Sequence, residues 1–441
     1  MPCSIAILGA GPAGLTLALA LSKRQEDITF MIFERATSHL EAAKYNPDRS
    51  YTIDITGHGI KAAKYVNVVD RFNEELICFK GIYFVSNPLK PIWDGKIPSK
   101  GWTGSRGDIC SVLLKELELR TTGSSSKIHF DSSVTSISVP TGCLTVEHHD
   151  GLKKRELVYT FDLIVAADGG GSMARSAMQG SVPGFTVTSH ELPNHSRMLH
   201  MDQNTGALDP GYLHVMGLPP LFLVAGAING ERGRDSPKWF CQVGTIGKRE
   251  YASPEEAQRH VSQVCPSLLT YASDRAFADF SSRECMPTGK SKVCSSFASG
   301  RVVLLGDAAA PFPPVGQGVN AAMEGAIVLD QCIGRALAAS PQPPDLGTLA
   351  RAALEYDRLW RDETGAMRAI AQELDFRQPL PSTLRAMAYA LVGCSALQNS
   401  KDEVMPYSAA LRRQRMLDGV LLGCATAVAA LVVWRFRRPN Q

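Results

Sequence analysis

The chain has 441 residues, of which 44% are hydrophobic and 20% charged, and its formal net charge is +3. This length can hold two or three domains with substantial cores, and the composition is ordinary for a globular protein. The small net charge and the lack of a basic stripe with interleaved aromatic residues disfavour a nucleic-acid partner. The 11 cysteines include no C-x-x-C pair, which disfavours a zinc site and a disulfide framework, so we expect no metal.

The first predicted elements form a βαβ unit that begins near the N-terminus. Residues 4–8 are apolar and suit a buried parallel strand, and residues 15–21 suit a helix. Between them, Gly9, Gly11 and Gly14 have the G-x-G-x-x-G spacing. These glycines permit a tight turn, the approach of the backbone to a pyrophosphate and the packing of helix against strand. The first N–H groups of the helix can then face the anion.

A second predicted strand, over residues 28–33, leads into Glu34. This acid follows Gly14 by roughly 20 residues, the spacing expected of a carboxylate that binds a ribose hydroxyl. The loop, the strands, the helix and the acid together predict dinucleotide binding. A glycine-rich turn that serves packing alone would leave Glu34 unexplained.

The middle of the chain alternates between helix and strand patterns. Residues 88–104 are rich in glycine and proline and indicate loops and short strands, whereas residues 108–120 have the apolar spacing of a helix. Strand patterns then recur at residues 128–130, 134–139, 144–148, 157–159 and 162–167. From about residue 180 to residue 290 the pattern predicts the mixed sheet of a substrate domain, with strands at residues 212–216, 221–228 and 239–243.

A second glycine-rich segment begins at Gly300, where an apolar strand leads to Gly306 and Asp307 and then to residues 316–320, Gly-Gln-Gly-Val-Asn. The two glycine-rich segments are interpreted as opposite ends of one flavin-binding site, which points to redox chemistry. Farther on, the sequence predicts a proline-rich linker at residues 341–344 and a long helix over residues 349–374.

The C-terminal end carries an apolar segment flanked by arginines. Residues 420–434 are uncharged and largely apolar, and extension back to residue 416 adds one acid, Asp418. A transmembrane helix needs about 20 such residues, and terminal arginines can extend a shorter span. An interfacial helix would need a polar face, which this segment lacks. We therefore predict a tail anchor over residues 416–434, in the mitochondrial outer membrane or the endoplasmic reticulum, with the catalytic part in the cytosol.

Three motifs in order carry a family resemblance. They are the loop from Gly9 to Gly14, the run Asp-Gly-Gly-Gly-Ser-Met-Ala-Arg at residues 168–175, and Gly306-Asp307 followed by Pro313 and residues 316–320. The chain resembles the class A flavoprotein monooxygenases of the 4-hydroxybenzoate hydroxylase fold over roughly residues 4–335. Residues 49–62 and the apolar C-terminal segment make it most similar to kynurenine 3-monooxygenases and fungal biosynthetic monooxygenases.

The resemblance implies an α/β fold with a Rossmann-like FAD-binding domain interleaved with a mixed-sheet substrate domain, followed by C-terminal helices. The FAD-binding parts would be residues 1–75, 106–180 and 291–335. The substrate-domain parts would be residues 76–105 and 181–290, and a helical region would cover residues 345–410.

The resemblance also implies how FAD would be held. Glu34 would bind the adenosine ribose with Arg35 beside the adenine, Arg106 would reach the ribityl–phosphate region, and Asp307 would bond the ribityl chain. Backbone N–H groups of residues 318–320 would favour negative charge at the flavin N1–C2=O edge. The remaining implied cofactor contacts are Gly9, Gly11, Pro12, Ala13, Gly14, Arg49, Asp54, Val134, Asp168, Gly318, Val319 and Asn320.

The implied reaction is NADPH- or NADH-dependent monooxygenation, in which oxygen bound at flavin C4a as a hydroperoxide hydroxylates an aromatic or electron-rich small molecule, within secondary metabolism. The partners would be the small-molecule substrate, O2 and a membrane. Candidate catalytic residues are His58, Tyr212 and Pro313, although packing or surface placement explains His58 and Tyr212 better, and Pro313 would belong to a pocket wall beside the flavin.

Departures from the family pattern narrow the range of possible substrates and activities. Ala310 stands where many relatives carry histidine, and residues 100–105 lack the tyrosine that the kynurenine enzymes use on a carboxylate, which disfavours kynurenine. A flavin halogenase would need a W-x-W-x-I-P segment, whereas Trp239 stands alone. A membrane-associated epoxidase acting on an isoprenoid and a redox-inactive FAD-binding scaffold remain as alternatives.

Overall fold

The computed structural model describes most of the chain. The described residues are 2–24, 27–41, 51–85, 94–151, 153–217, 221–340, 346–372, 389, 392–393, 395–401 and 405–437. Arg49 and the proline-rich segment 341–344, both singled out by the sequence, lie outside the described residues.

A six-stranded sheet forms the centre of the first domain. Its order is β18-β19-β10-β1-β2-β6, and all neighbours are parallel except β18 and β19. The central strand β1 is apolar on both faces, and Ile5 and Ile7 are fully buried, as expected of a parallel strand covered from both sides. The strands are β1 (Cys3–Leu8), β2 (Ile28–Phe33), β6 (Lys127–His129), β10 (Leu163–Ala166), β18 (Ala298–Ser299) and β19 (Val302–Leu304).

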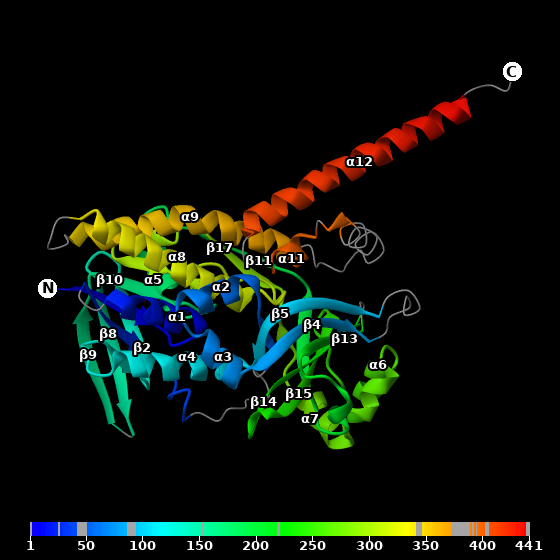
Figure 1. Cartoon of the computed structure of the whole chain (residues 1–441), viewed down its shortest axis with the longest axis horizontal. Helices are drawn as coiled ribbons and strands as arrows, with labels where there is room; N and C mark the ends of the chain where they lie inside the picture. Colours follow the sequence, from blue (N-terminus) through cyan, green and yellow to red (C-terminus); the bar gives the residue numbers. More distant parts are fainter. Residues whose placement is uncertain are drawn as a thin grey trace.

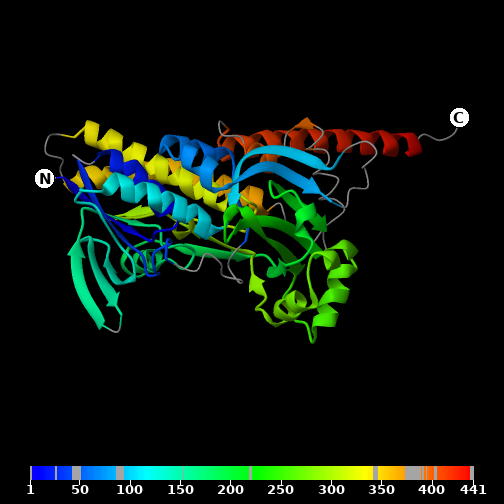
Figure 2. The same ribbon diagram turned by 60° about the horizontal axis from the view of Figure 1, so that its bottom comes forward.

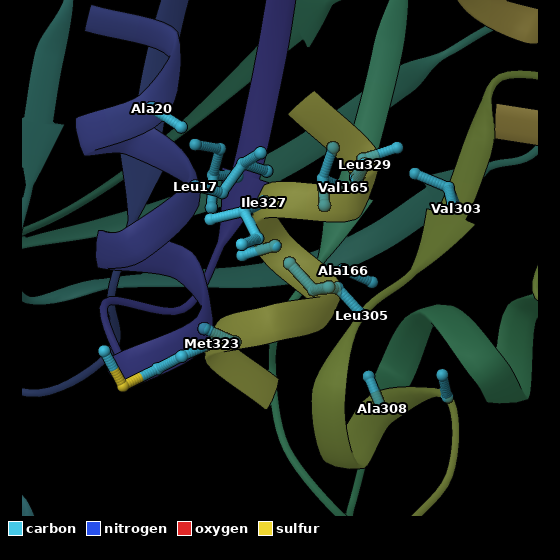
Figure 3. Close-up of a cluster of buried hydrophobic side chains, with 14 of the residues drawn as sticks. Leu17, Ala20, Val165, Ala166, Val303, Leu305, Ala308, Met323, Ile327 and Leu329 are labelled. Atoms are coloured by element: carbon cyan, nitrogen blue, oxygen red, sulfur yellow. The ribbon is translucent and has the colours of Figure 1, made fainter. Parts of the chain in front are cut away.

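Helices cover one face of this sheet and a small antiparallel sheet lies on the other (Figures 1 and 2). Leu17 of α1, Ile327 of α8 and Val165 of β10 meet in the shared hydrophobic core (Figure 3). On the opposite face the Phe33 ring packs against Tyr159 of the small sheet, with ring centroids 5.2 Å apart. These elements are α1 (Pro12–Leu21), α4 (Arg106–Thr121), α8 (Gly318–Ala338), α9 (Leu346–Gln372), β7 (Ser132–Ser138), β8 (Cys143–Asp150) and β9 (Lys153–Thr160).

A second, eight-stranded sheet covers most of the part that the sequence predicts to be a substrate domain, and we call it the substrate sheet. Its order is β16-β12-β15-β14-β13-β4-β5-β3, and β13–β4 is the one parallel pair within it. Trp239 of this sheet shares a hydrophobic cluster with Val261 and Phe277 of the helices α6 and α7. The strands are β3 (Ile53–Ile55), β4 (Ile77–Phe84), β5 (Lys96–Gly104), β12 (Asn194–Met201), β13 (Tyr212–Gly217), β14 (Leu221–Gly230), β15 (Gly233–Ile246) and β16 (Met286–Pro287), and the helices are α6 (Pro254–Ser262) and α7 (Asp274–Ser282).

Further elements of the described chain lie outside these three sheets. Strands β11 (Val187–Glu191) and β17 (Lys290–Cys294) pair antiparallel with each other. The remaining helices are α2 (Gly57–Tyr65), α3 (Val69–Glu75), α5 (Met173–Ser181), α11 (Ala396–Asn399) and α12 (Tyr407–Arg437).

The predicted mixed α/β class is confirmed, but one segment differs from expectation. Residues 96–104 form a nine-residue strand, β5, rather than short strands within a loop. Gly101 of β5 is closely packed, since a Cβ on it would lie 1.8 Å from the Ile55 carbonyl oxygen of β3. The glycine therefore lets the edge strand β3 come close to β5.

The C-terminal region packs against the first domain before α12 leaves it. The Tyr407 ring stacks on His58 of α2, with centroids 4.0 Å apart, and α12 then projects away from the body (Figure 1). Across the described part of the chain, no helix combines the length and the apolar character that crossing a membrane requires. The predicted tail anchor over residues 416–434 is therefore not supported, although most side chains from residue 421 onward lie outside the described set.

Candidate flavin site

The first glycine-rich loop has the geometry that its sequence predicts. Gly9 has a φ of +97°, and a Cβ there would lie 2.6 Å from the Ala167 carbonyl oxygen. A Cβ on Gly14 would lie 2.1 Å from the Gly9 carbonyl oxygen. The loop therefore turns tightly between β1 and α1, and α1 packs directly on it.

The start of α1 leaves backbone donors for a ligand. Gly11 is the N-cap and makes no side-chain capping hydrogen bond, and Pro12 occupies the first helical turn. The first N–H groups of a helix lack partners within the helix, and the helix dipole makes this end positive. Residues 11–14 thus present an anion-binding helix end, as a pyrophosphate requires.

Glu34 holds this loop in place. Its Oε2 accepts a hydrogen bond from the Ala10 N–H at 2.8 Å, and its Oε1 accepts one from the Ala36 N–H at 3.0 Å. Each carboxylate oxygen retains a second lone pair, so Glu34 can still accept from ribose hydroxyls. His39 adds a contact that the sequence did not single out, because its Nε2 lies 2.7 Å from the Ala10 carbonyl oxygen. Arg35 is exposed beside them.

Arg106 places a positive charge beside the first glycine-rich loop. It begins α4 behind Ser105, whose side chain forms a reciprocal capping box with Asp108. Its Nη2 lies 3.0 Å from the position that a Cβ on Gly11 would occupy. Among the described residues, the exposed guanidinium of Arg106 has no hydrogen-bond or ion-pair partner. A fixed fork of five donors beside the loop is therefore available for phosphate or ribityl oxygens.

Asp307, in the second glycine-rich segment, lies within the electrostatic range of Arg106. Its carboxylate is crowded by protein yet still reached by solvent. Burial raises the pKa of Asp307, while the positive charges of Arg106 and Arg175 act in the opposite direction. Tyr51, which the sequence analysis did not single out, lies within the electrostatic range of both Asp307 and Arg106.

The middle motif, residues 168–175, contacts the backbone of the second glycine-rich segment. The Nη1 of Arg175 donates to the carbonyl oxygens of Ala308 at 2.8 Å and Asp307 at 3.2 Å. Asp168 accepts a hydrogen bond from the Met173 N–H at 2.7 Å, at the first residue of α5, whose N-cap is Ser172. Both residues position backbone at the site, and the Oδ1 of Asp168 remains buried without a partner.

The start of α8 joins the two domains. Its N-cap, Gln317, makes no side-chain capping hydrogen bond, so the N–H groups at residues 318–320 are open to a ligand. Asn320 accepts a hydrogen bond from the Thr56 N–H and donates to the Asp54 carbonyl oxygen, both at 2.9 Å. A Cβ on Gly59 would lie 2.2 Å from the Asn320 Oδ1. Asn320 thus ties the edge strand β3 of the substrate sheet to the helix end.

The remaining predicted residues have other surroundings. Val134 lies in β7, half-buried against the core of the first domain. The Nδ1 of His58 lies 2.5 Å from the Glu324 Oε2, and Tyr212 packs edge-to-face on Tyr83 of β4 at 6.5 Å. Pro313 is buried in the segment before α8. Packing and the His58–Glu324 contact account for these surroundings, and a catalytic role for any of these residues stays a prediction.

Phe240 and His214 have different neighbours within the substrate sheet. Phe240 belongs to a small cluster with Met198 and Ile228, apart from the cluster at α6 and α7. The His214 ring packs edge-to-face on Trp239 at 5.5 Å, and its Nε2 lies 3.0 Å from the Asp209 carbonyl oxygen. His214 is therefore held by packing and a backbone contact.

FAD fits what these residues offer. Two helix ends without side-chain caps, two glycine-rich loops and the Arg106 guanidinium, which has no partner among the described residues, suit a ligand that combines phosphates, hydroxyls and a ring. In the first loop, a side chain at position 11 would meet the guanidinium of Arg106, so Gly11 keeps the space beside Arg106 free.

Comparison with known proteins gives the same picture. The profile of a family described as "FAD binding domain" matches residues 111–343, more than half of the chain. The kynurenine 3-monooxygenase of Salinispora arenicola is 25% identical over 98% of this chain and 98% of its own length. The kynurenine 3-monooxygenase of Sus scrofa is 25% identical over 75% of this chain and 69% of its own length.

Solved structures share the fold. The tetrameric form of 2-methyl-3-hydroxypyridine-5-carboxylic acid oxygenase superposes with a TM-score of 0.62 at 17% identity, covering 93% of this chain and 96% of that one. The anhydrotetracycline hydroxylase OxyS from Streptomyces rimosus has a TM-score of 0.59 at 17% identity and covers 94% of this chain and 76% of that one.

Proposed function

The chain belongs to the FAD-binding-domain family and is a FAD-dependent monooxygenase, and from this premise we propose that it hydroxylates an aromatic or other electron-rich small molecule, with NADPH or NADH as the reductant. The single observation that carries this proposal is the convergence of Arg106, Asp307 and the start of α8 beside the first glycine-rich loop. These are segments far apart in the sequence, and a bound flavin accounts for their meeting.

FAD, when bound, supplies the redox chemistry of oxygen transfer. The chain's own residues hold and orient it. The start of α1 and Arg106 would bind its phosphates, Glu34 its ribose and Asp307 its ribityl hydroxyls. The open N–H groups at the start of α8 would supply positive potential to a negatively charged reduced ring.

The substrate would lie where the two sheets meet. Thr52 donates to the Ala227 carbonyl oxygen of β14 at 3.3 Å, and the next strand, β3, is tied to Asn320. Residues 52–54 thus contact both the substrate sheet and the start of α8. Such a fixed arrangement holds the substrate at the distance that oxygen transfer requires and helps to exclude water. Kynurenine is not proposed as the substrate, because residues 100–105 lack the tyrosine of those enzymes.

The test is direct. The purified chain, loaded with FAD, is mixed with NADPH or NADH and a panel of phenols and other electron-rich aromatic compounds. We expect a flavin absorption spectrum, reductant oxidation that one class of compound accelerates, and a product that gains one atom from isotopically labelled O2. Failure to retain FAD, or oxidation of NADPH with no compound ever gaining oxygen, would contradict the proposal.

A further inference from the structure

One residue of the first glycine-rich loop, Ala10, is held on both sides by side chains from the segment that follows β2. The Ala10 N–H donates to the Glu34 Oε2 at 2.8 Å, and the Ala10 carbonyl oxygen lies 2.7 Å from the His39 Nε2. Ala10 is fully buried, so neither backbone group has water as an alternative partner. The two contacts therefore fix the peptide units on both sides of Ala10.

The contact with the carbonyl oxygen defines the state of the His39 ring. A carbonyl oxygen only accepts, so the His39 Nε2 must carry a hydrogen and donate it. The residue is itself held in place, because its ring packs edge-to-face on Phe130, with centroids 6.2 Å apart, and its carbonyl oxygen accepts from the Ser111 Oγ of α4 at 2.9 Å. Burial lowers the pKa of His39, so the ring is neutral at neutral pH. His39 is thus a fixed, uncharged donor.

The hydrogen bond to Ala10 determines where the next N–H points. In a trans peptide the C=O and the N–H lie on opposite sides, so the Gly11 N–H points away from His39. Gly11 is buried, and among the described residues its N–H donates to no protein acceptor. A buried N–H of this kind is rare and requires a partner. Arg106 lies beside the same residue, with its Nη2 3.0 Å from the position of a Cβ on Gly11, so the two donors together suit an anion.

We infer that His39 is a positioning residue for the cofactor: by holding the Ala10 carbonyl oxygen, it directs the Gly11 N–H toward the pyrophosphate of FAD. This inference rests on the proposed function and deepens it, since it assigns a further residue to the same flavin site. Without the His39 donor, the Ala10 carbonyl oxygen is buried and unpaired, which costs free energy. Rotation of the peptide relieves that cost and turns the Gly11 N–H away from the anion.

The test compares two substitutions that differ in the donor. His39→Phe keeps an aromatic ring against Phe130 but cannot donate, whereas His39→Gln places an amide N–H near the position of the Nε2. FAD binding to the full-length apoprotein is followed by flavin fluorescence at neutral pH, so turnover is not needed. We expect about three- to tenfold weaker binding in His39→Phe, as for the loss of one hydrogen bond, and binding within about twofold of wild type in His39→Gln.

Phosphorus NMR of bound FAD separates positioning from a general loss of packing, because its resonances report the surroundings of the pyrophosphate. We expect these resonances to move in His39→Phe and to coincide with those of wild type in His39→Gln. The matched control is His190→Phe, the same substitution at an exposed position on β11, which should leave affinity and resonances unchanged. Should His39→Phe fold poorly, His39→Leu provides a second variant without a donor.

The inference would be overturned by FAD affinity in His39→Phe equal to that of wild type, by a loss that His39→Gln does not restore, or by unchanged phosphorus resonances in His39→Phe. Oxygen transfer to a substrate by the wild-type preparation would still support the proposed function, so the two failures can be told apart.

Discussion

At the scale of single residues, Arg106 is the residue on which cofactor affinity most depends. Its guanidinium is exposed beside Gly11 and has no partner among the described residues, so its removal breaks no contact within the protein. A hydrogen bond to a charged group contributes about 1.5–3 kcal/mol. We therefore expect Arg106→Met to weaken FAD binding by about 10–100-fold with little change in the unfolding temperature of the apoprotein.

Equilibrium titration of apoprotein with FAD, followed by flavin fluorescence, measures this effect. Arg155→Met, at an exposed arginine of β9, is the control. Equal FAD affinity in Arg106→Met and wild type would show that another cation holds the phosphates.

Asp54 makes the free energy of unfolding depend on pH, and the direction of its pKa shift fixes the sign of this dependence. Burial raises its pKa from 3.8 to about 6, against the opposing effects of Lys401 and Thr103. Between about pH 4 and pH 6, the folded state keeps a proton that the unfolded chain has released, so the free energy of unfolding falls as pH rises through this window. The loss at neutral pH is at most about 3 kcal/mol. Asp54→Asn should therefore gain stability relative to wild type as pH rises, and urea unfolding of both proteins across this range measures the difference. Parallel curves would contradict the assignment.

The residues of the site differ in how far sequence could predict them. Gly9, Gly14 and Glu34 follow from local spacing, because a turn, a helix contact and a ribose carboxylate are fixed within one βαβ unit. His39 and Tyr51 were missed, since no local pattern marks a residue that reaches the loop from a connecting segment.

At the scale of elements, the tie between β3 and α8 joins the substrate sheet to the flavin end of the site. The sequence predicted a role for the backbone N–H of Asn320. It is the side chain, however, that joins β3 to α8, with three hydrogen bonds to Thr56, Asp54 and Gly316. Asn320→Asp replaces the amide donor with an oxygen that faces two carbonyl oxygens. We expect a loss of about 2–4 kcal/mol in the free energy of unfolding.

Chemical denaturation of the apoprotein measures the loss, and Gln398→Glu, the same amide-to-acid change at an exposed position on α11, is the control. Asn320→Asp should also loosen FAD, because α8 then meets β3 differently. A variant as stable as wild type would mean that the tie is not needed to join the two elements.

At the scale of the whole molecule, the chain passes repeatedly between two sheets, and the site lies where those passages meet. Strand β3 belongs to the substrate sheet although it precedes α2 and much of the first domain in sequence. The alternation of strand and helix patterns predicted an α/β fold, because each pattern reports local burial. The pairing of β3 with β5 was not predictable in the same way, because the glycines of β5 resemble turn signals until the partner strand is known.

This arrangement makes FAD a connector of distant segments, which amide hydrogen exchange can test. FAD should protect residues 9–14, 105–108 and 316–320 together, because the start of α1, Arg106 and the start of α8 all face it. Helices α6 and α7 pack in a separate hydrophobic cluster, so their exchange should change little. At a FAD concentration of a hundred times its Kd, the folded state should gain about 2.7 kcal/mol. Protection confined to residues 9–14 would mean that the ligand occupies only the first loop, and the joint site would then be wrong.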